Sequence, residues 1–236
     1  MAYPAVGGPY GLLPINLVGG QVYAGATRSL PIASGYAKNI GFGDTVSIIS
    51  TGYINRVDSS TGAASTFPIR PVGIFLGCSY TDPSLKYKVF KQYWPSGTVA
   101  SDAVAIIADD PDILMKVAVV NNSAVVVTSS GLTLANIGEN VGYYLKADTG
   151  VWVDGVNTAT GNSTLAIDKN TLGTTNSLPF RIVDTVKETA LSDGTFCEAI
   201  VAFNAPYTSI SQLATSPFTV TAAVAGGHQY RNPTGV

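Results

Sequence analysis

Residues 103–119 read AVAIIADDPDILMKVAV, two apolar runs separated by an acidic tetrad that contains a proline. Each run has the length of a strand and consists largely of Val, Ile and Ala, and the tetrad has the composition of a turn. The stretch therefore predicts two β-strands joined by a turn. Asp109, Asp110 and Asp112 could also bind a cation, but Ca²⁺ takes about six to eight oxygen ligands and the apolar residues that follow supply none from their side chains. We interpret the tetrad as a turn.

Strand-like patterns continue on both sides of this stretch. Residues 44–48 alternate polar with apolar side chains, and residues 52–57 follow a short Ser-Thr-Gly break, which predicts a hairpin. Residues 86–94 alternate as well, which predicts a half-buried strand. Its two faces would consist of Lys86, Lys88 and Gln92 on one side and Tyr87, Val89 and Tyr93 on the other. Further strands are expected at residues 72–77, 141–146, 181–186 and 195–203.

No segment carries a long amphipathic helical stripe, and only residues 132–136 suggest a short helix. The predicted fold class is therefore all-β (mainly β), with β-barrel or sandwich units and extended N-terminal and C-terminal arms. Residues 150–176, rich in Thr, Asn and Gly, predict a long surface loop or a small hairpin. The predicted division is an extended N-terminal arm at 1–40, a first β unit at 41–130, a second β unit at 131–205 and a C-terminal tail at 206–236.

Two short matches between the halves of the sequence suggest an internal duplication. GDTV at 43–46 resembles GENV at 138–141, and FPIRPV at 67–72 resembles LPFRIV at 178–183. The repeated unit would be a small barrel that begins with a glycine-acidic turn.

Only 12% of the 236 residues are charged, compared with about a quarter in ordinary globular proteins, and there is one histidine, His228, near the end. The sequence therefore offers little material for acid–base or metal chemistry, while its 46% hydrophobic residues suffice for a core. A net charge of −2 without a basic cluster argues against nucleic acid and anionic membrane as partners. The sequence contains no nucleophile elbow, phosphate-binding loop, dinucleotide fingerprint or Cys-x-x-Cys pair. We therefore expect a structural or binding protein rather than an enzyme, with no catalytic residue, cofactor or metal.

Four aromatic residues, Tyr80, Tyr87, Tyr93 and Trp94, are close in sequence and could form a sugar-binding platform or a protein contact. Tyr87 and Tyr93 are expected in the core, as aromatic side chains on strands usually are. Trp94 precedes a proline at the end of a predicted strand. It is the candidate residue for an interface.

The middle of the chain carries a wider pattern: VGIFLGC at 72–78, YTDP at 80–83, QYWP at 92–95, AVA at 103–105 and ADDP at 108–111. In this pattern the chain resembles capsid-associated structural proteins of tailed marine phages, including cyanophages, which look like decoration or cement proteins of an icosahedral head. The resemblance implies a mostly β protein, often a homo-oligomer such as a trimer, on the outer surface of the capsid in the virion. It also implies that the protein binds the major capsid protein, clamps neighbouring capsomers and has no catalytic activity.

In such a protein we expect the apolar N-terminal arm to contact the capsid. A chain with low charge, turn-rich β structure and apolar arms is suited to add an interface to an existing capsid lattice. Many weak contacts of this kind would stiffen the shell through avidity. The residues expected to make these contacts are Tyr3, Tyr10, Leu12, Leu13 and Ile15. Deletion of residues 1–15 would then leave a folded domain that no longer occupies phage heads.

Three alternatives remain open. The chain could be a phage head-fibre or tail adhesion module that binds host surface glycans through exposed aromatic side chains at loop ends. It could be a hydrolase that uses Asp109 with Glu139 or Glu198, since glycoside cleavage needs two carboxyl groups about 5 to 10 Å apart. A major capsid protein is the weakest alternative, because such folds usually include a long helix.

Overall fold

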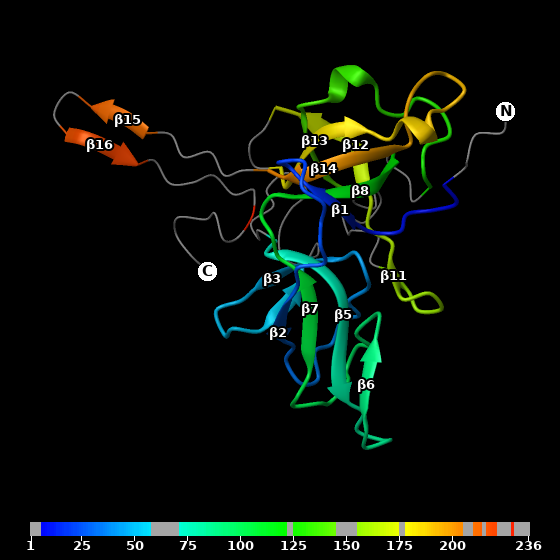
Figure 1. Cartoon of the computed structure of the whole chain (residues 1–236), viewed down its shortest axis with the longest axis vertical. Helices are drawn as coiled ribbons and strands as arrows, with labels where there is room; N and C mark the ends of the chain where they lie inside the picture. Colours follow the sequence, from blue (N-terminus) through cyan, green and yellow to red (C-terminus); the bar gives the residue numbers. More distant parts are fainter. Residues whose placement is uncertain are drawn as a thin grey trace.

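The computed structural model contains two β-barrels, which lie one above the other in Figure 1, and a short hairpin near the C-terminus. Nearly all regular structure is β, which confirms the predicted fold class. The structure describes residues 6–57, 71–121, 125–144, 155–174, 178–204, 210–213, 216–220 and 228.

Barrel 1 is formed by β2 (Arg28–Pro31), β3 (Thr45–Ile48), β4 (Ile54–Arg56), β5 (Gly73–Thr81) and β7 (Val104–Ala108). Its strands follow the order β2-β7-β5-β3-β4, and each pairs antiparallel with its neighbour. A parallel bridge between Ile32 and Ile54 joins the two ends of the sheet and closes the barrel. A further strand, β6 (Lys88–Lys91), pairs with β5 outside the barrel.

Barrel 2 is formed by β8 (Ile113–Val120), β9 (Asn140–Tyr143), β12 (Ile167–Gly173), β13 (Phe180–Thr185) and β14 (Glu198–Phe203). Its order is β8-β12-β9-β13-β14, and β14 pairs back with β8, so the sheet closes on itself. The N-terminal strand β1 (Leu13–Leu17) pairs antiparallel with β8. The other elements are the 3-10 helices η2 (Leu134–Asn136) and η3 (Lys187–Thr189), the hairpin of β10 (Val156–Asn157) with β11 (Asn162–Ser163), and the hairpin of β15 (Ile210–Leu213) with β16 (Ser216–Val220).

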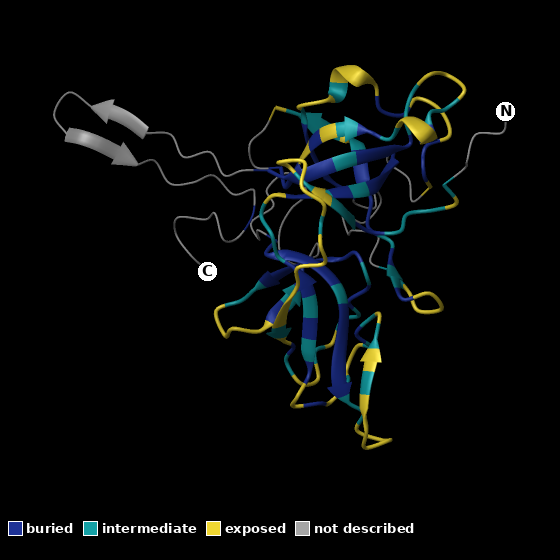
Figure 2. Cartoon of the chain, in the orientation of Figure 1, coloured by how far each residue is buried: buried dark blue, intermediate teal, exposed yellow. Residues whose placement is uncertain are grey.

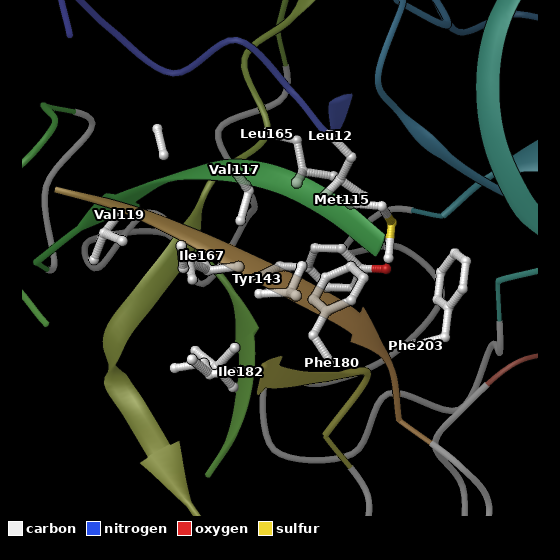
Figure 3. Packing of buried hydrophobic residues seen from close by; sticks show 14 of the residues in the cluster. Leu12, Met115, Val117, Val119, Tyr143, Leu165, Ile167, Phe180, Ile182 and Phe203 are labelled. Carbon is white, nitrogen blue, oxygen red and sulfur yellow. The ribbon is translucent and has the colours of Figure 1, made fainter. Parts of the chain in front are cut away.

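One apolar cluster lies in barrel 2 and extends to Val57, Ile74 and Ala108 of barrel 1, and a second cluster lies within barrel 1. Most residues of the barrel strands are buried or partly buried in Figure 2. In barrel 2 the rings of Tyr143 and Phe180 meet edge to face, with centroids 4.9 Å apart, among the aliphatic side chains seen in Figure 3. In barrel 1 the rings of Tyr80 and Trp94 make the same kind of contact at 5.3 Å. Such aromatic pairs contribute about 0.5–1.5 kcal/mol of stability beyond that of the apolar area they bury, so they stabilise both cores.

The two barrels repeat one backbone arrangement at a glycine-acidic turn. The amide of Gly43 donates to the carbonyl of Phe75 at 2.8 Å, and the amide of Phe75 donates to the carbonyl of Asp44 at 2.8 Å. In barrel 2, Gly138 and Ile182 make the same reciprocal pair at 2.8 and 2.9 Å. Both glycines have a left-handed φ, +87° and +92°, which favours glycine at this step of the turn.

The correspondence continues around both sheets. The order β2-β7-β5-β3-β4 in barrel 1 matches β8-β14-β13-β9-β12 in barrel 2, and in both the first and last strands are joined by parallel bridging. A β-bulge follows Phe75 in β5 and Ile182 in β13, at the same position relative to the turn. The two barrels therefore share one strand order and one turn geometry, and the internal duplication stays an interpretation that agrees with this topology.

The second of the two sequence matches is shifted relative to this structural alignment. It equates Val72 with Val183, whereas the shared bulge makes Leu76 the equivalent of Val183. The register of β5 and β13 is set by their pairing with the glycine-acidic turn, which a match of isolated side chains does not detect. Residues 58–70, which contain most of the first copy of this match, lie outside the described residues.

The barrels do not divide at the predicted boundary between residues 130 and 131. Strand β8 falls within the predicted first unit, 41–130, but it belongs to barrel 2. The tetrad is a turn, as predicted, in which the amide of Asp112 donates to the carboxylate of Asp110 at 2.8 Å. This turn carries the chain from β7 of barrel 1 to β8 of barrel 2, so the two strands that flank it lie in different sheets.

Several local predictions are confirmed, and several strands were missed, among them β15 and β16 in the predicted C-terminal tail. The predicted hairpin within residues 44–57 is the β3–β4 pair, and the short helix expected at 132–136 is η2. Residues 150–176 contain the expected small hairpin, β10–β11, but also the barrel strand β12, whose polar sequence gives no strand signal. The predicted arm at 1–40 supplies β1 and β2 to the two sheets, so much of it is built into the barrels.

Gly43→Ala and Gly138→Ala form a matched test of the repeated turn. Either alanine would adopt a left-handed φ, which costs about 1–2 kcal/mol. A Cβ at Gly43 would also lie 2.8 Å from the amide nitrogen of Leu12, whereas one at Gly138 would meet nothing within 4 Å. We expect Gly43→Ala to reduce the free energy of unfolding by about 1–3 kcal/mol more than Gly138→Ala, as measured by urea denaturation. Equal losses would contradict the close packing of Leu12 against Gly43.

Candidate functional site

The turn that leads from β5 into β6 is held by its own hydrogen bonds and projects from barrel 1 at the end far from barrel 2 (Figure 1). The carboxylate of Asp82 accepts hydrogen bonds from the amides of Leu85, at 3.0 Å, and Ser84, at 2.8 Å. These bonds hold the pKa of the Asp82 carboxyl below its ordinary value. The amide of Asp82 donates to the carbonyl of Tyr87 at 3.0 Å, and Lys86 takes a left-handed φ of 59°. The tip is therefore a defined turn.

This hairpin presents large apolar side chains to solvent. Leu85 and Tyr87 are each 57% exposed and Phe90 is 74% exposed. In Figure 2, exposed positions lie along β6. Because aromatic side chains are enriched in protein interfaces and clustered exposed apolar groups mark interaction sites, we treat these residues as a candidate contact surface. We call Leu85, Tyr87 and Phe90 the β6 patch.

An open groove adjoins Phe90 on barrel 1. It is lined by the apolar residues Phe42, Leu76 and Ile106, by Gly77 and Cys78 of β5, and by Lys91 and Gln92. A Cβ at Gly77 would lie 3.1 Å from the carbonyl oxygen of Lys91, so glycine permits the close approach of β5 and β6 at the bulge. The groove and the β6 patch together form one surface that mixes apolar and polar groups, as protein interfaces do.

Three lysines, Lys86, Lys88 and Lys91, accompany the apolar residues of the β6 patch. The ammonium group of Lys91 lies 5.7 Å from the centroid of the Tyr80 ring, and a hydrogen bond with Tyr80 raises the pKa of Lys91 above its ordinary value. Among the described strands, β6 pairs only with β5, so its second edge is open. Lysines on such an edge discourage unspecific strand pairing, which favours recognition through side chains.

The structure reverses two predictions about the aromatic residues. Trp94, the predicted interface residue, is fully buried because its ring packs edge to face on Tyr80 in the core of barrel 1, so it is not available to a partner. Tyr87, which was expected in the core, is largely exposed, whereas Tyr93 is half-buried. Phe90 was overlooked, although it shares the face of Lys86 and Lys88 in the alternating pattern, and within β6 both Lys88 and Phe90 are exposed.

The predicted arm contacts lie mostly against this chain's own barrels. Leu12 is fully buried in the core cluster that fills barrel 2, which contradicts its expected role as a capsid contact. Leu13 and Ile15 are partly buried in β1, and Tyr10 packs against the same cluster. Tyr3 lies outside the described residues. Deletion of residues 1–15 would therefore remove core and sheet contacts rather than a free arm.

Tyr10 is tied to barrel 2 by a buried acidic group. Its hydroxyl donates to the carboxylate of Glu198, which is 3% exposed and lies 3.4 Å from the ammonium nitrogen of Lys116. Burial, and then the hydrogen bond with Glu198, raise the pKa of the Tyr10 hydroxyl well above its ordinary value. The Lys116 ammonium also lies 5.6 Å from the centroid of the Tyr10 ring. This contact holds the N-terminal segment on the outside of barrel 2.

A second buried polar cluster lies at the junction of the barrels. The carboxylate of Asp44 accepts hydrogen bonds from the amide of Gly41 at 2.7 Å and from the hydroxyl of Ser163 at 2.5 Å. The guanidinium of Arg56 lies 3.7 Å from this carboxylate and donates to the carbonyl of Asn39 at 3.0 Å. Because Ser163 belongs to β11, the cluster joins the turn of barrel 1 to barrel 2.

The carboxyl groups considered for hydrolysis have separate local partners. These are Arg28 for Asp109, Asn136 for Glu139, and Tyr10 and Lys116 for Glu198. Within the described ranges, no three His, Cys, Asp or Glu residues gather in a group that could hold a metal ion. His228, which we placed in a tail, is fully buried, with its ring centroid 5.0 Å from that of Phe203.

No family model, curated protein or solved structure matches this chain. In the part of the chain that the structure describes, no helix is long and apolar enough to cross a membrane. The features of this chain that point to a partner are the β6 patch and the adjoining groove.

Tyr10→Phe tests whether the N-terminal segment is structural. The substitution removes the donor to a buried carboxylate, so we expect the free energy of unfolding to fall by about 1.5–3 kcal/mol. The matched control, Tyr87→Phe, changes an exposed ring and is expected to alter stability by less than about 0.5 kcal/mol. Urea denaturation followed by circular dichroism measures both. An unchanged stability of Tyr10→Phe would contradict the role assigned to the Glu198 contact.

Proposed function

We propose that this chain is a structural protein of a phage particle that binds the outside of the icosahedral head and stabilises contacts between capsomers. The observation that carries the proposal is the position of the β6 patch. It lies within residues 72–119, the segment in which the sequence resembles capsid decoration proteins of tailed phages. In this proposal the partner is the major capsid protein, and the β6 patch with the adjoining groove replaces the N-terminal residues as the contact.

The chemistry of the β6 patch supports a protein partner. Tyr87 and Phe90 combine large apolar area with few rotatable bonds, as aromatic hot spots in interfaces do. The neighbouring lysines would favour an acidic or polar rim on the capsid side. A single contact of this size is weak, but copies repeated over a symmetric shell would gain from avidity if the protein is itself multivalent.

The direct test is binding of the purified chain to heads of the phage that carries this sequence, prepared without the protein. We expect cryo-electron microscopy to show density on the outer surface at a copy number set by the capsid symmetry. Mass spectrometry of native particles should give the same ratio to the major capsid protein. Absence from native particles, or failure to bind heads, would refute the proposal, and binding of a glycan array with density only on tails or fibres would favour the adhesion module.

The double variant Tyr87→Ser/Phe90→Ser tests the contact itself. Two interface aromatic side chains contribute about 1–2 kcal/mol each, so we expect the dissociation constant for heads to rise at least about tenfold. The control is Val22→Ser, which changes a side chain that is 78% exposed near β1. Full occupancy by the double variant would remove the β6 patch from the proposal, whereas loss of binding by the control would show that the effect is unspecific.

A further inference from the structure

The last part of the chain leaves barrel 2 and returns to the same place. Strand β14 ends at Phe203, and the amide of Asn204 donates to the carbonyl of Pro179 at 2.8 Å. His228 is fully buried, and its ring centroid lies 5.0 Å from that of Phe203. The two ends of the segment 205–227 are therefore held close together on barrel 2, and this segment contains the β15–β16 hairpin.

The β15–β16 hairpin pairs with no other strand that the structure describes. In Figure 1 it lies apart from both barrels. The other two-stranded sheet, β10–β11, is supported by backbone hydrogen bonds with Phe42, whereas among the described residues no such bond joins β15–β16 to a barrel. An isolated two-stranded hairpin is only marginally stable in water, and a stable sheet needs three or more strands. The hairpin therefore lacks at least one strand.

The sequence of this hairpin lacks the residues that protect an exposed strand edge. Residues 199–230 contain no Asp, Glu, Lys or Arg, whereas β6, another strand with an open edge, carries Lys88 and Lys91. Charged side chains and proline on an edge strand discourage pairing with other chains. Strand β16 contains Pro217, which has no amide hydrogen to donate, whereas β15 contains neither proline nor charge. The unprotected edge is therefore that of β15.

We propose that two copies of this chain associate through β15, which pairs antiparallel with β15 of the second copy about a two-fold axis. The resulting sheet has four strands in the order β16-β15-β15-β16, enough for a stable sheet. The partner is a second copy because an uncharged edge is matched by an edge that has no charge to desolvate, and the same hairpin supplies one. A two-fold dimer uses the same surface on both copies, so no second site on the chain is required. This inference does not depend on binding to a capsid, and a dimer would carry two β6 patches.

Sedimentation equilibrium of the full chain, with Ser211→Lys, Ser211→Glu and Thr219→Lys, tests the pairing. The mass of the wild type is expected to rise with concentration from 24.4 kDa, the mass of one chain, to twice that value. Ser211 lies within β15, so either substitution there brings like charges together across the axis and should weaken dimerisation at least about tenfold. An equimolar mixture of Ser211→Lys and Ser211→Glu brings opposite charges together and should dimerise more tightly than either variant alone. Thr219→Lys, in β16 on the far side of the hairpin from the axis, is the matched control and should dimerise as the wild type does.

Three kinds of result would overturn the proposal. The first is a wild type that stays monomeric up to about 1 mM, where even weak specific association is detectable, or that exceeds the mass of two chains. The second is Ser211→Lys that dimerises as the wild type does, or Thr219→Lys that dimerises as weakly as Ser211→Lys, since either would remove β15 from the contact. The third is a mixture that dimerises no more tightly than the single variants. Circular dichroism of each variant confirms that the barrels are folded, so that a loss of dimers is not a loss of the fold.

Discussion

The buried carboxylate of Asp44 is the contact on which the arrangement of the two barrels depends. It is 3% exposed, and its charge is balanced by Arg56 and by donors from Gly41 and Ser163. Removal of one partner from a buried ion pair typically costs about 3–5 kcal/mol, because the remaining charge stays in a low-dielectric environment. This charged group links the glycine-acidic turn of barrel 1, the β4 strand and the β10–β11 hairpin, and it acts together with the backbone hydrogen bonds of Phe42. Through this carboxylate, a turn of barrel 1 contacts a hairpin that belongs to the second half of the chain.

The repeat has diverged where the surroundings of its two copies differ. Glu139 occupies the position of Asp44, but it is half-buried and accepts a hydrogen bond from the side chain of Asn136 within its own turn. The longer side chain of Glu139 reaches a donor within its own turn at the surface. The shorter side chain of Asp44 accepts hydrogen bonds within the buried junction of the two barrels. The backbone pairing is nevertheless the same in both turns, and it sets the register of β5 and β13.

Much of the fold was predictable from the sequence, and the errors have physical causes. The β3–β4 hairpin and the acidic turn follow local rules, and both were found. Strand β12 was missed because its sequence is polar and has little intrinsic strand propensity. It forms a strand because it pairs with β8 and β9 on its two sides, which depends on the tertiary fold. Trp94 was placed at an interface because a strand end was predicted there, whereas its contact with Tyr80 depends on tertiary packing. For the candidate site, the alternation of residues 86–94 could have identified Phe90, which shares the face of Lys88, but it placed Tyr87 on the buried face. The left-handed backbone of Lys86, which interrupts the alternation, is set by the turn and is not visible in the pattern.

The connection between the barrels also determines how the chain responds to force. Two separate segments cross the junction: Gly11 and Leu12 bond to Leu165 and Gly43, and the β10–β11 hairpin bonds to Phe42. A force that separates the barrels would load these hydrogen bonds together, and rotation of one barrel against the other would have to break them. The junction therefore resists bending more than a flexible linker between two domains would.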